Sequence, residues 1–569
     1  MPEEHVSDSQ STASQPTRQP LPLILIRGFG GLGIEDEKRV AYQGFNDGTV
    51  YPKKRGDNYI YEGMIIKFMK SAWQYQDATN VVGYFPTPIV DSSGVPHSLR
   101  DLPDDFFYQP AGSDASVEPL YKVVIDPGMA LTIRDRQKTR DPTRTLWVFR
   151  YYDLNDRTFQ LYGRVLVRLI DFIRGLASDG SGPDRTIPKV NIIAHSMGGL
   201  IVREAIQRSY PEAGRRADDY INKVVTLGTP HRGIAFQVLS HWIGIDAKEE
   251  LEHFSPDFQE AADNPVAYAK LGDHFDPRRF LTVVGTNYKT YGVKISTWAN
   301  RLFSVAEEFG PNYNRSDGLV KQLYAQIPGA PRTFVHKCHG GDDSLVTSRE
   351  AFEISTRFFF GNLRVRLRMV DGRITRGKDF FGKSEFFFGV SIKPRRVDFD
   401  LFHQSVEAEN CYGPFSATDA DGAVDFSEPR DKLAFGWADA KRLIWEGFLD
   451  TSHVMPDPST GVRDMVFRLD FYVGERDMFG IGFSDNVVFR KQYYLRTLID
   501  EVPPQLYLLN NESFMADSRP PGTTTVVPAG WMFDVAGTGF EGTFQVELDI
   551  VPEDGEPVPL QTAEPPAKA

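Results

Sequence analysis

Cysteine and long apolar runs are scarce in this sequence. Two of its 569 residues are cysteine, Cys338 and Cys411, so at most one disulfide could form. This excludes a fold held together by several disulfides and favours a reducing compartment. The apolar run LPLILI at positions 21–26 is far shorter than the roughly 18–20 residues that a membrane-spanning helix needs.

A secretory signal and an excess of basic charge are missing as well. The first twenty residues lack the basic start and apolar centre of a signal peptide. We therefore expect a cytoplasmic location, with export that needs no such signal as the alternative. The 64 lysines and arginines are outnumbered by 77 aspartates and glutamates, which gives a formal net charge of −13. This balance argues against a polyanion-binding surface, and no nucleic acid partner is expected.

The composition, 41% hydrophobic and 25% charged, is that of a folded protein. Residues 1–20 and 553–569 are polar and rich in proline, so we expect a disordered leader and a disordered tail. In the region 21–361, short apolar runs alternate with segments of helical spacing. This alternation predicts an α/β fold, with a mostly parallel sheet covered by helices. Irregular insertions are expected at about 33–143 and 234–301.

The predicted elements of this region follow from apolar runs bounded by glycine and from helical periodicity. Strands are expected at 21–26, 145–152, 189–194, 222–227, 280–284 and 332–335, and helices near 62–73 and at 159–176, 198–208 and 350–360.

The pattern changes after Gly361. Leu363, Val365 and Leu367 alternate with arginines, which predicts a strand with one face in water. Similar strands separated by turns recur across residues 362–552. We therefore expect a second, mainly antiparallel β region that resembles a sandwich.

The segment IIAHSMGGLI at 192–201 is the most informative of the chain. An apolar strand runs into Ser196 and continues as an apolar helix. A serine on such a sharp turn exposes its hydroxyl and needs small neighbours, and Ala194 and Gly198 meet this need. The N–H of Met197 would lie at a helix N-terminus, where an oxyanion could be bound. The alternative is an ordinary serine in a turn between a strand and a helix.

This segment resembles the nucleophile elbow G-x-S-x-G of the α/β-hydrolases, with Ala194 in place of the first glycine. The resemblance covers about 21–361 and is to the lipase/esterase branch, including proteins similar to GPI inositol deacylase and to bacterial lipases. It implies that the loop Arg27-Gly28-Phe29-Gly30-Gly31 stands where the family usually has His-Gly-Phe-Gly. The backbone N–H groups of Phe29 and Met197 would then form the oxyanion hole.

The family's chain order is nucleophile, acid, histidine. On that order Asp317, in the turn RSDGLV, is the expected acid, and His339 is the expected base. His336, at the end of a strand, is the alternative base. His231, in the segment GTPHRG, resembles a structural or pocket-wall residue of lipases rather than the base.

These assignments predict a serine hydrolase that cleaves carboxylic esters through an acyl-enzyme on Ser196. The apolar insertion at 234–301 and the 41 phenylalanines favour lipid esters and allow contact with a membrane surface. No metal and no cofactor are expected. Two other functions remain open: a binding or scaffold protein that kept the hydrolase fold, and a thioesterase or amidase with the same triad. The sequence leaves the oligomeric state open.

Overall fold

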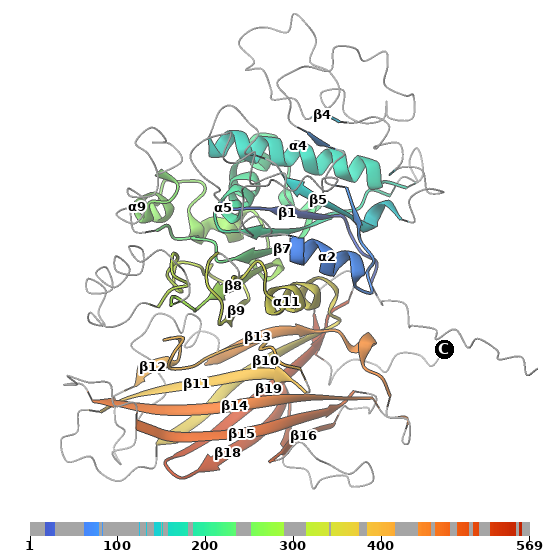
Figure 1. Ribbon diagram of the computed structural model, residues 1–569. Helices are drawn as coiled ribbons and strands as arrows, with labels where there is room; N and C mark the ends of the chain where they lie inside the picture. Colours follow the sequence, from blue (N-terminus) through green and yellow to red (C-terminus); the bar gives the residue numbers. More distant parts are fainter. Residues whose placement is uncertain are drawn as a thin grey trace, which may run out of the picture.

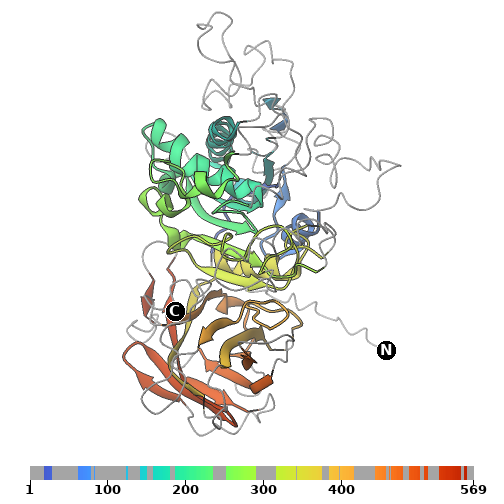
Figure 2. The same ribbon diagram turned by 90° about the vertical axis from the view of Figure 1, so that its left-hand side faces the viewer.

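The computed structural model describes most of the predicted strands and helices. It describes residues 18–28, 62–78, 141–149, 158–179, 186–234, 252–289, 315–340, 343–374, 384–395, 397–415, 442–456, 463–477, 486–499, 505–510 and 524–552, with short pieces at 82–83, 124–125, 133, 151, 461 and 557–559. Phe29, residues 1–17 of the predicted leader, most of the predicted insertion at 33–143, residues 235–251 and 290–301 of the second insertion, and most of the predicted tail lie outside the described residues. Figures 1 and 2 show an upper body that contains the helices and a lower body of long strands.

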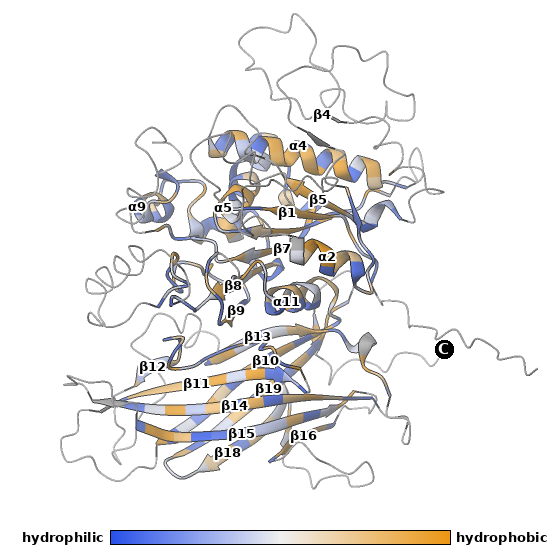
Figure 3. Ribbon diagram, viewed as in Figure 1, coloured by the Kyte–Doolittle hydropathy of each residue, from blue (hydrophilic) through white to orange (hydrophobic). Residues whose placement is uncertain are grey.

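The upper body is built on a seven-stranded sheet in the order β2-β5-β1-β6-β7-β8-β9, with parallel pairing throughout. These strands are β1 (Leu23–Ile26), β2 (Gln76–Asp77), β5 (Thr145–Phe149), β6 (Val190–His195), β7 (Ile221–Leu227), β8 (Phe280–Gly285) and β9 (Arg332–Val335). All residues of β1, β6 and β8 are buried, as expected for strands covered on both faces. Figure 3 shows β1 as a largely hydrophobic ribbon.

Helices cover both faces of this sheet. Figure 1 shows α4 above β1 and β5, and α2 and α11 lower down, at the level of β7, β8 and β9; α5 packs against α4. The helices are α2 (Glu62–Lys70), α4 (Phe159–Ala177), α5 (Met197–Glu204), α6 (Tyr210–Glu212), α9 (Pro256–Glu260) and α11 (Arg349–Phe360). Between α5 and α6 the chain forms a π-helix over Ala205–Ser209, so the helix predicted at 198–208 is observed with a wider turn in its second half. None of the helices in the described part of the chain is both long and apolar enough to span a membrane.

The upper body and the β region also contain shorter strands and helices. Two short strands, β3 (Val82–Gly83) and β4 (Val124–Ile125), pair antiparallel outside the main sheet. Short 3₁₀ helices occur at Pro142–Arg144, Ala217–Asp219, Tyr268–Asp273, Pro277–Arg279 and Thr451–His453.

The lower body consists of two antiparallel sheets. One has the order β13-β10-β19-β18-β17, with β20 beside β19, and the other has the order β12-β11-β14-β15-β16. Their strands are β10 (Leu363–Ile374), β11 (Ser384–Pro394), β12 (Tyr412–Phe415), β13 (Leu443–Leu449), β14 (Asp464–Asp477), β15 (Asn486–Leu498), β16 (Gln505–Leu509), β17 (Thr524–Val527), β18 (Gly530–Gly537), β19 (Phe540–Ile550) and β20 (Val558–Pro559). Phe388 and Phe471 of one sheet contact Phe544 of the other, with ring centroids 5.8 and 4.8 Å apart. The predicted fold class, a parallel α/β domain followed by a mainly antiparallel β region, is confirmed.

The outer face of β10 differs from the prediction. Its arginines are half-buried or buried rather than in water, because carboxylates on the neighbouring strand β19 lie opposite them. Arg364 pairs with Asp549 at 2.8 Å, and Arg366 and Arg368 pair with Glu547 at 2.9 and 2.8 Å. Alternation along one strand cannot reveal this, since the partner charges come from residues almost two hundred positions away.

Candidate active site

Ser196 lies between the last residue of β6 and the first residue of α5. Its backbone has φ 51° and ψ −125°, a conformation that residues other than glycine rarely adopt and that costs about 1–3 kcal/mol. Two hydrogen bonds hold it there: its N–H donates to the carbonyl of Leu227 at 3.0 Å, and its carbonyl accepts from the N–H of Gly199 at 3.1 Å. The sharp turn expected from the sequence is therefore present.

Glycines allow the neighbouring chain segments to pack directly on this turn. A Cβ on Gly198 would lie 2.7 Å from the carbonyl oxygens of both Ile26 and Arg27, at the end of β1. A Cβ on Gly28 would lie 2.7 Å from the Cβ of Ser196. Because real Cβ atoms do not come this close to other atoms, both positions require glycine for steric reasons.

The structure brings Asp317 and His339 to Ser196. The Nε2 atom of His339 lies 2.9 Å from the Oγ of Ser196, and its Nδ1 atom lies 2.8 Å from the Oδ2 of Asp317. All three residues are buried, with exposed fractions of 6% for Ser196, 1% for Asp317 and 4% for His339. The N–H of His339 also donates to the backbone carbonyl of Asp317 at 2.9 Å, which ties the two loops together.

The hydrogen bonds of Asp317 determine how His339 is protonated. The other carboxylate oxygen, Oδ1, accepts from the N–H groups of Leu319 at 3.0 Å and Val320 at 2.8 Å. An ionised carboxylate only accepts, so the proton of the neutral imidazole lies on Nδ1, toward Asp317. The lone pair of the Nε2 atom then points toward Ser196 and can accept its hydroxyl proton.

The alternative base, His336, is in a different environment. Its Nδ1 atom lies 3.1 Å from the Oγ1 of Thr286, and its ring lies 5.1 Å from the ring of His403 in the β region. Burial and, after it, the neighbouring His403 lower the pKa of His336. The histidine that is hydrogen bonded to Ser196 is His339.

His195 is a further site residue that sequence reasoning missed. Its Nε2 atom lies 2.9 Å from the carbonyl oxygen of His339, and the two rings are 4.9 Å apart. Burial and, after it, the proximity of His339 hold the pKa of His195 well below its usual value. The ring is therefore neutral near pH 7, and the Nε2–H donates to the loop that carries His339. The sequence did contain one indication that His195 belongs to the site, because this residue directly precedes Ser196.

Of the two residues expected to form the oxyanion hole, the structure describes Met197. Met197 is the first residue of α5, and the first N–H groups of a helix have no partner inside the helix. Phe29 lies outside the described residues, but Gly28 before it is described. The carbonyl of Gly28 accepts from the hydroxyl of Tyr151 at 2.7 Å and from the Nε of Arg27 at 3.3 Å. The side chain of Arg27 thus turns back onto its own loop, and Tyr151, just after β5, supports that loop.

A second Ser-His-Asp chain lies in the β region. The Nε2 of His403 lies 3.0 Å from the Oγ of Ser405, and its Nδ1 lies 2.6 Å from the Oδ2 of Asp400. Two backbone N–H groups beside it are in use, because the N–H of Ser405 donates to the Oδ1 of Asn410 and the N–H of Ala408 donates to the Oγ of Ser405. Ser405 also has no positive φ and precedes no helix. This chain therefore stabilises a turn and lacks the strand–serine–helix geometry found at Ser196.

His231 lies beside the sheet rather than at Ser196. It is fully buried, its Nε2 lies 3.0 Å from the Oγ1 of Thr226, and its carbonyl accepts from Arg203 at 2.8 Å. Within the described residues, no group of three or more His, Cys, Asp or Glu side chains is arranged to hold a metal ion.

A comparison with known protein families finds a similarity over part of the chain. Residues 121–243 match the family described as the PGAP1-like alpha/beta domain, and this segment includes β5, α4, β6, Ser196, α5 and β7. No curated protein matches the chain.

Solved structures resemble the chain only weakly. The mature lipase BlEst2 of Bacillus licheniformis is 13% identical with a TM-score of 0.28, and the alignment covers 60% of this chain and 94% of that one. The metagenomic carboxyl esterase MGS0156 is 16% identical with a TM-score of 0.24, over 38% of this chain and 66% of that one. The predicted resemblance is confirmed at the level of the fold: the segment around Ser196 matches a PGAP1-like alpha/beta domain, and the first part of the chain has an α/β-hydrolase fold.

Proposed function

We propose that this protein is a serine hydrolase that cleaves carboxylic esters, with lipid esters as its substrates, through an acyl-enzyme on Ser196. The observation that carries the proposal is the continuous hydrogen-bonded chain from Asp317 through His339 to Ser196, with distances of 2.8 and 2.9 Å. Serine is a poor nucleophile unless a base accepts its proton, and this arrangement supplies one.

The reaction begins when the Oγ of Ser196 attacks the ester carbonyl carbon and its proton passes to the Nε2 of His339. The carbonyl electron pair moves onto oxygen, and the negative carboxylate of Asp317 stabilises the imidazolium. His339 then returns the proton to the alcohol oxygen as the C–O bond breaks, which leaves the acyl group on Ser196. Water repeats the sequence and releases the carboxylic acid.

The developing oxyanion would be bound by the backbone N–H groups of Met197 and Phe29. Each such donor contributes about 3–4 kcal/mol to transition-state stabilisation. Because backbone groups do the binding, Arg27 in place of the usual histidine is compatible with the mechanism. The contact between Tyr151 and the carbonyl of Gly28 supports the position of this loop.

The lipid part of the proposal rests on the apolar residues of the insertion at 234–301, which include Phe236, Leu239, Trp242 and Ile243. Burial of an acyl chain in a hydrophobic pocket contributes about 0.8 kcal/mol of binding free energy for each CH₂ group. We therefore expect kcat/KM to rise with chain length from p-nitrophenyl acetate to the octanoate. A flat or falling series would contradict lipid esters while leaving the esterase mechanism intact.

Fluorophosphonate labelling and p-nitrophenyl butyrate hydrolysis test the mechanism together. The wild-type chain should label at Ser196, identified by peptide mapping so that Ser405 is distinguished, and should hydrolyse the ester. Ser196→Ala should abolish both activities with unchanged thermal unfolding. Ser355→Ala is the matched control, since its hydroxyl only donates to the carbonyl of Ala351 within α11, and it should keep both.

The other outcomes separate the alternatives. Hydrolysis that persists in Ser196→Ala would refute the assigned nucleophile. A wild-type chain that neither labels nor hydrolyses any acyl substrate would support the scaffold function. Labelling at Ser196 with turnover of thioesters or amides alone would support those substrate classes instead.

A further inference from the structure

Asp317 lies in a short loop over residues 315–322, defined here as the acid loop. The N–H of Gln322 donates to the carbonyl of Arg315 at 2.7 Å, and the N–H of Asp317 donates to the carbonyl of Val320 at 3.1 Å. These bonds shape the loop, and the bond from the His339 N–H to the Asp317 carbonyl links it to the base. The position of the loop also depends on what holds its two ends.

Both ends are tied to the β region, at a turn over residues 405–410 that we call the brace. A carboxylate oxygen of Glu409, Oε2, accepts from the backbone N–H of Arg315 at 2.9 Å. At the other end, the side-chain amide of Gln322 donates to the carbonyl of Ala408 at 2.7 Å. Gln322 and Ala408 are fully buried. Two adjacent residues of the brace therefore hold the first and last residues of the acid loop.

Glu409 bridges more than one segment of the hydrolase domain. Its second carboxylate oxygen, Oε1, accepts from the hydroxyl of Tyr288, which follows β8, at 3.2 Å. Both Glu409 and Arg315 have positive φ angles, of 51° and 42°. Such conformations persist only where surrounding contacts over-determine them, and here the two strained residues are hydrogen bonded to each other.

The brace is itself rigidly placed relative to the hydrolase sheet. Residues 401–403, just before it, pair with β11 on one side, where the N–H of Ile392 donates to Phe402 and the N–H of Leu401 donates to Ile392, both at 2.8 Å. On the other side the N–H of His403 donates to the carbonyl of Phe334 in β9 at 2.9 Å. Figure 1 shows β9 directly above β13 and the neighbouring strands of the β region. Since His339 follows β9, the acid and the base are both positioned from this junction.

We propose that Glu409 is a positioning residue for the reaction and that the β region is in this way a structural part of the active site. This inference rests on the proposed function. Without its bond to Glu409, the acid loop can move away from His339, and a displacement of about 1 Å in a catalytic group costs up to about 100-fold in rate. In this role Glu409 acts through the acid loop rather than on the ester, so kcat should fall while KM changes little.

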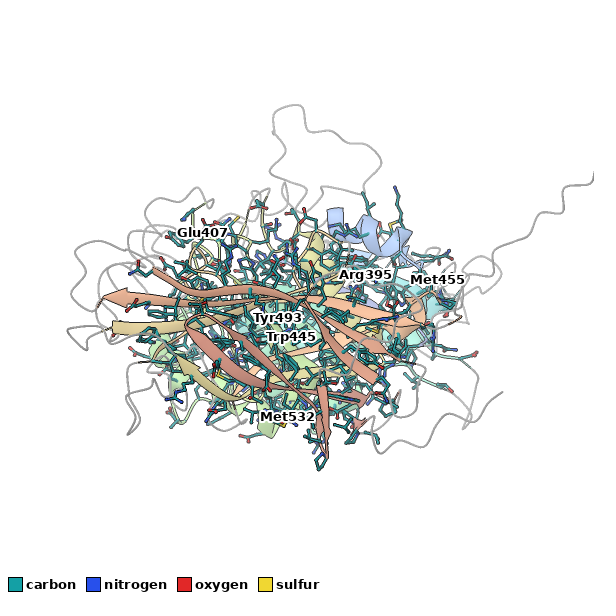
Figure 4. The ribbon with its side chains drawn as sticks, turned by 90° about the horizontal axis from the view of Figure 1, so that it is seen from below. Arg395, Glu407, Trp445, Met455, Tyr493 and Met532 are labelled. Carbon is teal, nitrogen blue, oxygen red and sulfur yellow. The ribbon has the colours of Figure 1, made fainter. Side chains whose placement is uncertain are left out.

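The test compares three variants of the full-length chain by p-nitrophenyl butyrate kinetics and by the rate of fluorophosphonate labelling. Glu409→Ala should lower kcat and the labelling rate by about 10- to 100-fold. Glu409→Gln should restore most of the rate, since its carbonyl can still accept from Arg315 and its amide can donate to Tyr288. Glu407→Ala is the matched control: Glu407 is exposed, lies toward the edge of the molecule in Figure 4, and should keep full activity.

A double-mutant cycle with Asp317→Asn distinguishes positioning from general destabilisation. If Glu409 acts through Asp317, the effect of Glu409→Ala should largely disappear in the Asp317→Asn background; independent effects would add instead. Gln322→Ala, which removes the other tie, should reproduce the loss of kcat if Glu409→Ala proves too unstable to measure.

The outcomes separate this inference from the function on which it rests. An active wild type in which both Glu409→Ala and Gln322→Ala keep full kcat would overturn the positioning role alone, as would additive effects in the cycle. A wild type with neither labelling nor ester turnover would overturn the proposed function, and the positioning role with it.

Discussion

Replacing Gly28 by alanine adds one methyl group at the most crowded point of the site. The new Cβ would lie 2.7 Å from the Cβ of Ser196 and 3.1 Å from the Nδ1 of His195. Non-bonded carbon atoms are optimally about 3.5–4.0 Å apart, so the overlap with Ser196 is about 1 Å. Gly28 is not among the glycines with positive φ, and its backbone conformation is therefore open to alanine. The substitution tests packing alone.

The overlap can be relieved in two ways, and each disturbs the site. Either Ser196 moves away from His339, or the end of β1 moves and takes the N–H of Phe29 with it. The bond between Tyr151 and the carbonyl of Gly28 opposes the second movement. A shift of about 1 Å in reacting groups costs about 100-fold in rate, which corresponds to about 2.7 kcal/mol in the activation free energy. Overpacking should also lower the free energy of unfolding by about 1–3 kcal/mol.

The assay is kcat for p-nitrophenyl butyrate at a temperature where each variant is folded, together with thermal unfolding. Gly163→Ala in α4 is the matched control, because its Cβ would meet the Oγ of Ser209 at 2.6 Å and the Cγ of Glu204 at 3.0 Å, away from Ser196. It should lose stability but keep its turnover per folded molecule. A Gly28→Ala enzyme that retains more than about a third of the wild-type kcat would refute the reasoning that this contact fixes the site.

Two further predictions concern charge. Asp317→Asn should lower kcat about 10⁴-fold with an intact fold, since an amide favours the wrong tautomer of His339; a loss below about tenfold, measured with the same ester, would contradict the assigned role. Burial and, after it, neighbouring arginines lower the pKa of Lys223 to about 7, so the unfolded chain binds more protons than the folded chain between about pH 7 and 10. The free energy of unfolding should therefore rise with pH across this range, and Lys223→Met should remove that rise whereas Lys70→Met, at an exposed position, should keep it. Denaturant unfolding at several pH values checks this, and equal slopes for Lys223→Met and the wild type would contradict it.

Much of the seven-stranded parallel sheet could be predicted because its strands are short, continuous apolar runs. The strand expected at 332–335 is observed over Arg332–Val335, and the helix expected at 159–176 is α4. Parallel strands covered on both faces produce this pattern directly, since every residue is buried. The polar face of β10 was predicted less well, because ion pairs across a sheet depend on residues of other strands.

The position of Ser196 was predictable for a local reason: the strand, the turn and the helix are contiguous, and small residues flank the serine. Asp317 and His339 were predictable only through the chain order of a resembling family. The choice between His339 and His336 depends on contacts with Thr286 and His403, from segments that no local pattern connects.

The contacts that support the site could not be predicted from the sequence. The residues with strained backbone conformations show the reason. Glycine is the residue that usually indicates a left-handed backbone, yet Ser196, Arg315 and Glu409 adopt positive φ without being glycine. At each of them glycine would remove the strain. It would also remove the hydroxyl of Ser196 or the carboxylate of Glu409, each of which is hydrogen bonded to a distant segment. A strained residue that is not glycine therefore indicates where a remote contact matters, and that contact becomes visible only when the segments are brought together in space.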